Sequence, residues 1–144
     1  MMLDRVDIQR LVPQRGAMCL LDAVVNWDPL HISCRAAVPR TAHPLVRDHR
    51  VPAIVAIEYA AQAAAVHGAL LDPAAAPRDG MLAKLNEVHL HADQIPTDGA
   101  LLDVRAERLG ITERGCMYRF DVSSGNRPVA SGRLIVAFGL PPSP

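Results

Sequence analysis

The stretch HPLVRDHRVPAIVAIEYAAQAAA, residues 43–65, ends in a long apolar run, from residue 51 onward, that contains a single acidic side chain. From residue 53 to residue 71 the chain is rich in alanine and has almost no polar face, which predicts a helix surrounded by protein on nearly all sides. Pro52 fits the first helical position, where its missing N–H is not needed, and Pro73 marks the far end. The carboxyl of Glu58 inside such a helix is costly unless it is paired, neutralised or used in chemistry.

Strand patterns flank this helix on both sides. Residues 18–27 and 31–38 are strand-like and are separated by a DPL turn signal, and a short helix over residues 4–11 precedes them. A helix with no solvent face needs a sheet that curls around it, and about six antiparallel strands supply such a wrap. The order therefore predicts an α+β protein of the hotdog architecture, in one domain over residues 1–144. Four further strands are expected over residues 81–92, 101–109, 116–123 and 129–138, with a hairpin at SGNRP.

Composition and charge limit the classes of molecule that the protein is expected to bind. Half of the 144 residues are hydrophobic, which is enough for one core. The 15 basic and 15 acidic residues are scattered and give a formal net charge of zero, which argues against nucleic acid or an anionic membrane surface as a partner. The apolar run is long enough to cross a bilayer, but Glu58, Gln62 and His67 interrupt it, so we interpret it as a core helix. The charged N-terminus lacks the apolar core of a signal peptide and the three cysteines form no CxxC pair, so we expect a cytoplasmic protein with free thiols.

Two segments resemble those of a known enzyme family. LVPQRGAMCLLDAVV is similar to the N-terminal PHR…LLLD motif of the β-hydroxyacyl-acyl-carrier-protein dehydratases, and HPL…VPAIVAIEYAAQ resembles their HFPG…PG…E…AQ segment. The likeness continues weakly through IPTDGALLDV and NRPVASGRLIV, and it is closest to the divergent hotdog dehydratases found beside polyene and fatty-acid-like pathways. Three positions depart from the pattern: Gln14 replaces a common histidine, Ala53 replaces a glycine, and His43 precedes Glu58 by fifteen residues instead of fourteen.

The resemblance implies a cofactor-free and metal-free dehydration of 3-hydroxyacyl thioesters to trans-2-enoyl thioesters, with the acyl chain on acyl carrier protein or coenzyme A. Such a reaction needs a base, an acid and a group that polarises the carbonyl. His43, in a loop that Pro39 and Pro44 predict to be extended over about residues 40–51, is the candidate base. Glu58, with its proton affinity raised by burial, is the candidate acid. In dimeric relatives these groups come from different subunits, so the resemblance implies a homodimer or a higher assembly of dimers.

Neighbouring groups complete the expected site. Free backbone N–H groups of Ala53 and Ile54, at the start of the helix, are the candidate oxyanion donors. Gln62 lies one turn after Glu58 and is expected to hydrogen-bond its carboxyl. The basic residues expected to meet an acidic carrier protein are Arg47, Arg50, Arg78 and Lys84.

Alternatives remain open for the two central residues. Glu58 could instead form a salt bridge with Arg47 or Arg50, and His49 is a rival base, although it lies in a charged cluster. Two other functions are compatible with the pattern. A hotdog thioesterase would use the helix carboxylate to activate water, and a non-catalytic partner subunit of a dehydratase pair would keep the pocket without turnover.

The remaining histidines and polar residues favour structural roles. His67 is expected to be a satisfied histidine at the end of the helix. His89 and His91 share one face of a strand and could bind a metal, but no third ligand is in register, so solvent exposure is favoured. Asp22 is expected to close local hydrogen bonds, and Tyr59 either lines an acyl tunnel or packs in the core.

Overall fold

The computed structural model describes residues 2–12, 14, 16–39, 43–72, 80–112 and 115–138. The chain forms two helices, two 3₁₀ turns and seven strands in these parts. In order they are β1 (Leu3–Asp4), α1 (Arg5–Gln9), a 3₁₀ turn (Gly16–Met18), β2 (Ala23–Trp27), β3 (His31–Ala36), a second 3₁₀ turn (Ala53–Val55), α2 (Ala56–Leu71), β4 (Gly80–Leu90), β5 (Leu102–Thr112), β6 (Gly115–Ser124) and β7 (Arg127–Phe138).

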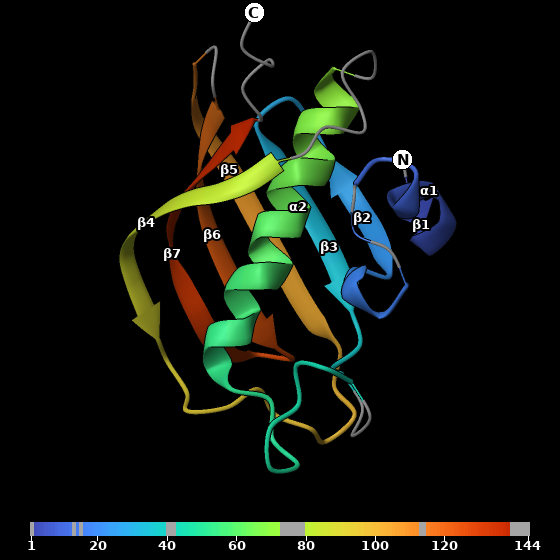
Figure 1. Cartoon of the computed structure of the whole chain (residues 1–144), viewed down its shortest axis with the longest axis vertical. Coiled ribbons are helices and arrows are strands. Elements are labelled where there is room, and N and C mark those ends of the chain that lie inside the picture. The colour runs from blue at the N-terminus through green and yellow to red at the C-terminus, as the bar shows by residue number, and fades with distance from the viewer. Residues whose placement is uncertain are drawn as a thin grey trace, which may run out of the picture.

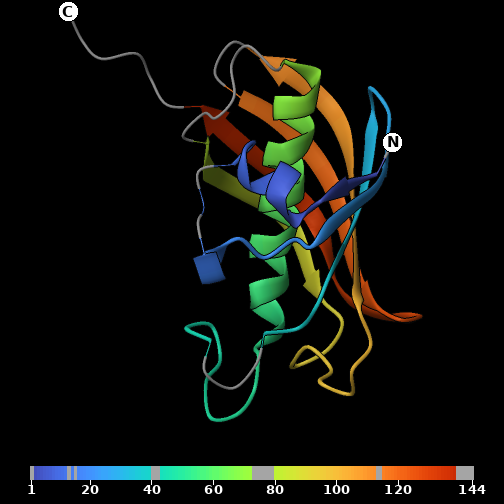
Figure 2. The same cartoon turned by 90° about the vertical axis from the view of Figure 1, so that its right-hand side faces the viewer.

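The strands form one antiparallel sheet in the order β1-β2-β3-β5-β6-β7-β4. The sheet curves around α2, which lies on its concave side (Figures 1 and 2). The predicted wrap of a sheet around one long helix is confirmed, with seven strands instead of about six. The seventh is β1, in which Leu3 and Asp4 pair with Val24 and Ala23 at the edge of β2.

Helix α2 and its 3₁₀ start cover the predicted residues 53–71. Pro52 precedes the first turn, with φ −57° and ψ 143°, and it forms an isolated bridge with Gln94. By length and composition alone, the segment Ala53–Leu71 could cross a membrane, with a mean hydropathy of 1.4. Inside the protein 61% of this apolar window is buried, as in a core helix.

The two faces of the sheet differ in polarity because side chains alternate along each strand. The face toward α2 is apolar and belongs to one continuous core, which includes Ile32 and Cys34 of β3, Val104 of β5, and Tyr118 and Phe120 of β6. Small alanine side chains on α2 let the sheet approach the helix closely.

The other face carries charged side chains that pair across strands. The Nε atom of Arg35 in β3 lies 3.4 Å from Oδ1 of Asp103 in β5. The Oε2 atom of Glu107 in β5 lies 3.5 Å from Nη1 of Arg119 in β6. Such exposed pairs each contribute little free energy. Their density nevertheless identifies this as the face in contact with water on the single chain.

The predicted turns are present, but most element boundaries shift by a few residues, most of all at the start of β2. Asp28 accepts backbone N–H bonds of 2.8 Å from both Leu30 and His31 and closes the β2–β3 hairpin, and these bonds lower its pKa. The β6–β7 hairpin turns at Gly125, where φ is 59°. The N-terminal helix is only Arg5–Gln9, and the strand expected from residue 18 begins at Ala23, because residues 16–18 form a 3₁₀ turn.

Candidate active site

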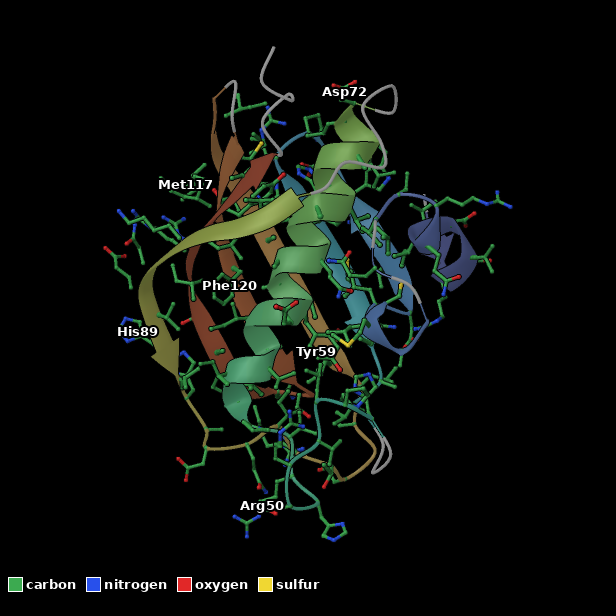
Figure 3. The ribbon with its side chains drawn as sticks, in the orientation of Figure 1. Arg50, Tyr59, Asp72, His89, Met117 and Phe120 are labelled. Atoms are coloured by element: carbon green, nitrogen blue, oxygen red, sulfur yellow. The ribbon has the colours of Figure 1, made fainter. Side chains whose placement is uncertain are left out.

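A tight hairpin precedes α2 in the segment predicted to be an extended loop. Arg47 and Arg50 exchange backbone hydrogen bonds of 2.7 and 2.8 Å, and Asp48 (φ 50°) and His49 (φ 62°) occupy the left-handed region at its tip. This backbone costs about 1–2 kcal/mol for each residue other than glycine. Arg50 projects from the end of the molecule where α2 begins (Figure 3). The prediction was therefore wrong for residues 47–50, and residues 40–42 lie outside the described residues.

His43 is held by hydrogen bonds at both ring nitrogens. Its Nε2 lies 2.6 Å from the carbonyl oxygen of Ala17, and its Nδ1 lies 3.1 Å from the backbone N–H of Leu45. Because an amide N–H donates and a carbonyl accepts, the proton is on Nε2 and Nδ1 is the acceptor. The imidazole is therefore neutral here, with its lone pair directed at the Leu45 amide. A general-base role requires this contact to open.

A cavity of about 540 Å³ lies beside His43. Tyr59 of α2 lines it and donates a 3.1 Å hydrogen bond to the carbonyl of Ala37. Asp22 also lines it, accepting the Ala37 N–H at 2.7 Å and a bond of 3.2 Å from Arg5. Burial, and secondly the charge of Asp22, raise the pKa of Tyr59, so its hydroxyl stays protonated at neutral pH. Asp22 does accept hydrogen bonds, but its partners are fifteen and seventeen residues away, so the expectation of local bonds is wrong. Sequence reasoning missed Arg5, because no pattern connects it to Asp22.

Glu58 is exposed, so the expectation of a buried carboxyl is wrong for the single chain. It belongs to a stripe along α2 and the preceding 3₁₀ turn that the sheet leaves uncovered. The stripe also contains Ile54, which is 59% exposed, and the half-buried Ala61 and Ala65. It does not line the cavity beside His43. The alternative salt bridge is also absent, because no ion pair of Glu58 occurs among the described residues.

The two candidate oxyanion donors differ in whether their backbone N–H groups already form a hydrogen bond within the chain. The N–H of Ala53 donates to the carbonyl of Asp93 at 3.1 Å, so the expectation that it is free is wrong. The cause is the bridge between Pro52 and Gln94, which brings the segment after β4 against the helix start. For Ile54, no acceptor for the backbone N–H is present in the described parts of the chain, as expected.

Gln62 does not contact Glu58, and that expectation is also wrong. Its side chain is 1% exposed, its Oε1 accepts the N–H of Leu20 at 2.9 Å, and its Nε2 donates to the carbonyl of Met18 at 2.7 Å. An offset of four residues turns a side chain about 40° around a helix, which is enough to move Gln62 from the uncovered stripe to the side facing residues 16–22.

His67 is a satisfied histidine, as predicted. It is fully buried, with Tyr118 Oη 2.7 Å from its Nδ1 and the carbonyl of Asp28 2.7 Å from its Nε2. Since the carbonyl can only accept, Nε2 carries the proton and the tyrosine hydroxyl donates to Nδ1. Burial lowers the pKa of His67, and the bond to Asp28 opposes this in part.

The other histidines stand apart from His43. His49 lines a separate cavity of about 510 Å³ with Thr97. His89, near the end of β4, and His91, just after this strand, are both exposed, and their ring centroids are 6.4 Å apart. The Nε2 atom of His91 lies 2.9 Å from Ser131 Oγ. In the described residues, no three potential ligands converge on a point where a metal would bind.

A curved antiparallel sheet wrapped around one long helix defines a hotdog fold. A hypothetical thioesterase with coenzyme A from Streptococcus pneumoniae has the same fold at 12% identity, with a TM-score of 0.61, over 83% of this chain and 87% of that one. The AziG structure from S. sahachiroi is similar at 15% identity, with a TM-score of 0.58, over 80% and 88% of the two chains.

Comparison with protein families identifies the chain more narrowly than the fold does. The ApeP-like family, described as ApeP dehydratase, matches residues 6–139, so this chain belongs to the ApeP-like dehydratases. The dehydratase heterocomplex ApeI:P from Xenorhabdus doucetiae is similar at 26% identity, with a TM-score of 0.81, over 92% of this chain and 91% of that one. No curated protein sequence matches the chain significantly. The predicted resemblance to hotdog dehydratases is confirmed.

Proposed function

We propose that this chain supplies His43 and Glu58 to the dehydration of 3-hydroxyacyl thioesters, with each catalytic pair divided between two hotdog protomers. The observation that carries the proposal is the position of Glu58. It lies on the uncovered stripe of α2, outside the cavity that His43 lines in the same chain. These positions support a site in which the two side chains come from different protomers, and contact with the second protomer would also remove the Glu58 carboxyl from water.

In the proposed reaction His43 removes the proton at C2 of the acyl chain. The electron pair of the C2–H bond forms the C2–C3 double bond as the C3–O bond breaks, and Glu58 protonates the departing hydroxyl, which leaves as water. The N–H of Ile54 stabilises negative charge on the thioester oxygen. For His43 to accept a proton at Nδ1, the Leu45 amide must leave this atom. For it to accept at Nε2, the ring must change tautomer and release both the Leu45 amide and the Ala17 carbonyl.

The second protomer is proposed to be either another copy or a related hotdog subunit. The similar structure from X. doucetiae is a heterocomplex, which favours a related subunit. The double hydrogen bonding of His43 favours a second candidate function, in which this chain is the non-catalytic partner of an active subunit.

The acyl group is proposed to arrive on acyl carrier protein or coenzyme A, in the cytoplasm. Arg47 and Arg50 are exposed on the hairpin at the start of α2, where an acidic carrier could meet them. Lys84 is exposed on β4, and Arg78 lies outside the described residues. The three cysteines are free and buried, which is compatible with a reducing compartment.

The test uses hydration of a crotonyl-type enoyl thioester by the purified protein, alone and with its companion subunit. Loss of hydration in both His43→Ala and Glu58→Gln, with activity retained in His49→Ala and Glu107→Gln, supports the proposal. The controls remove a histidine of the other cavity and a carboxyl of the outer sheet face. Release of free thiol would support a thioesterase instead. Activity that survives both substitutions in the active assembly would assign this chain the non-catalytic role.

Mixing the two inactive variants tests the divided site. If the active form is a homodimer, random reassociation makes about half of the dimers mixed, and each mixed dimer holds one intact pair, so about a quarter of the wild-type activity returns. If mixing restores nothing while the wild-type homodimer is active, the pair is not shared between protomers.

A further inference from the structure

The buried amide of Gln62 ties α2 to the segment before β2. Gln62 and His67 are buried polar side chains of α2, and both the oxygen and the nitrogen of the Gln62 amide form hydrogen bonds. Oε1 accepts from Leu20 and Nε2 donates to Met18, at 2.9 and 2.7 Å, and both partners are backbone groups more than forty residues away in sequence. The two bonds hold residues 18–20 at a fixed distance from the helix.

The same segment carries the group that orients His43. The carbonyl of Ala17, in the peptide unit next to the one that Gln62 binds, accepts the 2.6 Å bond from His43 Nε2. The turn that contains it is closed by a 3.1 Å bond from the Cys19 N–H to the Gly16 carbonyl. Leu45, the other partner of the ring, is two residues from His43 and moves with the same loop. The Ala17 contact therefore links the imidazole to the body of the protein.

We infer that Gln62 is a positioning residue for His43, acting through residues 17–20. The amide fixes the Ala17 carbonyl, and the carbonyl fixes the position and the Nε2-protonated tautomer of the ring. The inference rests on the proposed function only for its effect on activity, because the tautomer and position of His43 can be observed in the absence of turnover.

The test compares Gln62→Met with Tyr118→Phe in the full chain. Methionine has nearly the length of glutamine but no polar end, so it removes both bonds and little volume. Tyr118→Phe is the matched control, because it removes another buried 2.7 Å hydrogen bond from the same core without touching residues 17–20. If Gln62→Met fails to fold, Gln62→Leu replaces it, because leucine is another apolar side chain that forms neither of the two bonds.

The first readout is the ¹⁵N spectrum of the six imidazoles, with His43 assigned by its absence in His43→Ala. We expect the wild-type ring to be protonated at Nε2, the Gln62 variant to show averaging of the His43 tautomers, and Tyr118→Phe to leave the His43 signals unchanged. A His43 signal that is unchanged in the Gln62 variant, or a wild-type ring protonated at Nδ1, would overturn the inference.

The second readout is enoyl-thioester hydration in the active assembly. A displaced base lowers kcat on the order of 10²-fold, with a smaller change in KM, while Tyr118→Phe stays near the wild-type value. If the tautomer changes as expected but the wild-type assembly does not need His43 for activity, the positioning role of Gln62 stands and the proposed function fails. A Gln62 variant with an unchanged kcat in an assembly that does need His43 contradicts the positioning role.

Discussion

Replacing His67 with glutamine is expected to make the stability of the folded chain less sensitive to acid. His67 is fully buried and its pKa is lowered from 6.5, mainly by burial. Below pH 6.5 the unfolded chain therefore binds a proton that the folded chain does not, so stability falls as the pH falls and is fully present above this value. If His67 in the folded chain takes up no proton, the free energy of unfolding at about pH 5.5 is about 1.4 kcal/mol lower than at neutral pH.

Glutamine offers the same two contacts without titrating. Its amide N–H₂ can donate to the Asp28 carbonyl, and its oxygen can accept from the Tyr118 hydroxyl. Urea unfolding measured between about pH 8 and pH 5.5 gives the slope of the unfolding free energy for the wild type, for His67→Gln, and for His89→Gln as an exposed control. We expect a shallower slope only in His67→Gln. Equal slopes in the wild type and His67→Gln would refute the assignment of a buried neutral imidazole.

Three further predictions concern packing and burial. Gly115→Ala is expected to destabilise the fold by about 1–3 kcal/mol or more, because its Cβ would collide with the backbone carbonyl of Val136. The control Gly110→Ala has open space around its Cβ and should change the melting temperature little. The Cys34 thiol is 1% exposed and burial raises its pKa to about 12, so it should not react with a thiol reagent at about pH 8 until the protein unfolds. Tyr59→Phe removes the hydroxyl bond beside the candidate cavity and should cost about 1 kcal/mol in urea unfolding, while keeping the apolar wall.

The extent of α2 and of most strands could be predicted because it is encoded locally. The alanine-rich run predicts the helix to within its observed bounds, and the DPL and SGNRP turns occur where predicted. The strand start near residue 18 was wrong because β-propensity does not report that Gln62, more than forty residues away, binds the backbone there. The two-residue hairpin at Asp48 and His49 was missed because neither is the glycine or asparagine that usually indicates left-handed backbone.

The candidate site was less predictable than the fold. His43 and Glu58 follow from the motif resemblance, but the sequence of a helix that is apolar all round does not show which stripe the sheet leaves open. Ala53 was expected to have a free N–H, since any first turn has one. Its partner, the carbonyl of Asp93, comes from a segment that approaches only in three dimensions. Tertiary contacts therefore decide which donors remain for a substrate.

The cross-strand charges on the outer face of the sheet also act as a check on strand alignment. If one strand shifts by two residues relative to its neighbour, every side chain stays on its correct face of the sheet. The buried core then opposes the shift only through imperfect packing. In the observed alignment Arg105 is opposite Asp121, and Glu107 is opposite Arg119. A slip of β6 by two residues in one direction would place Arg105 opposite Arg119, and in the other direction would place Glu107 opposite Asp121. Like charges directly opposite one another are destabilising, so cross-strand charges that contribute little to the native state penalise its nearest misaligned competitors.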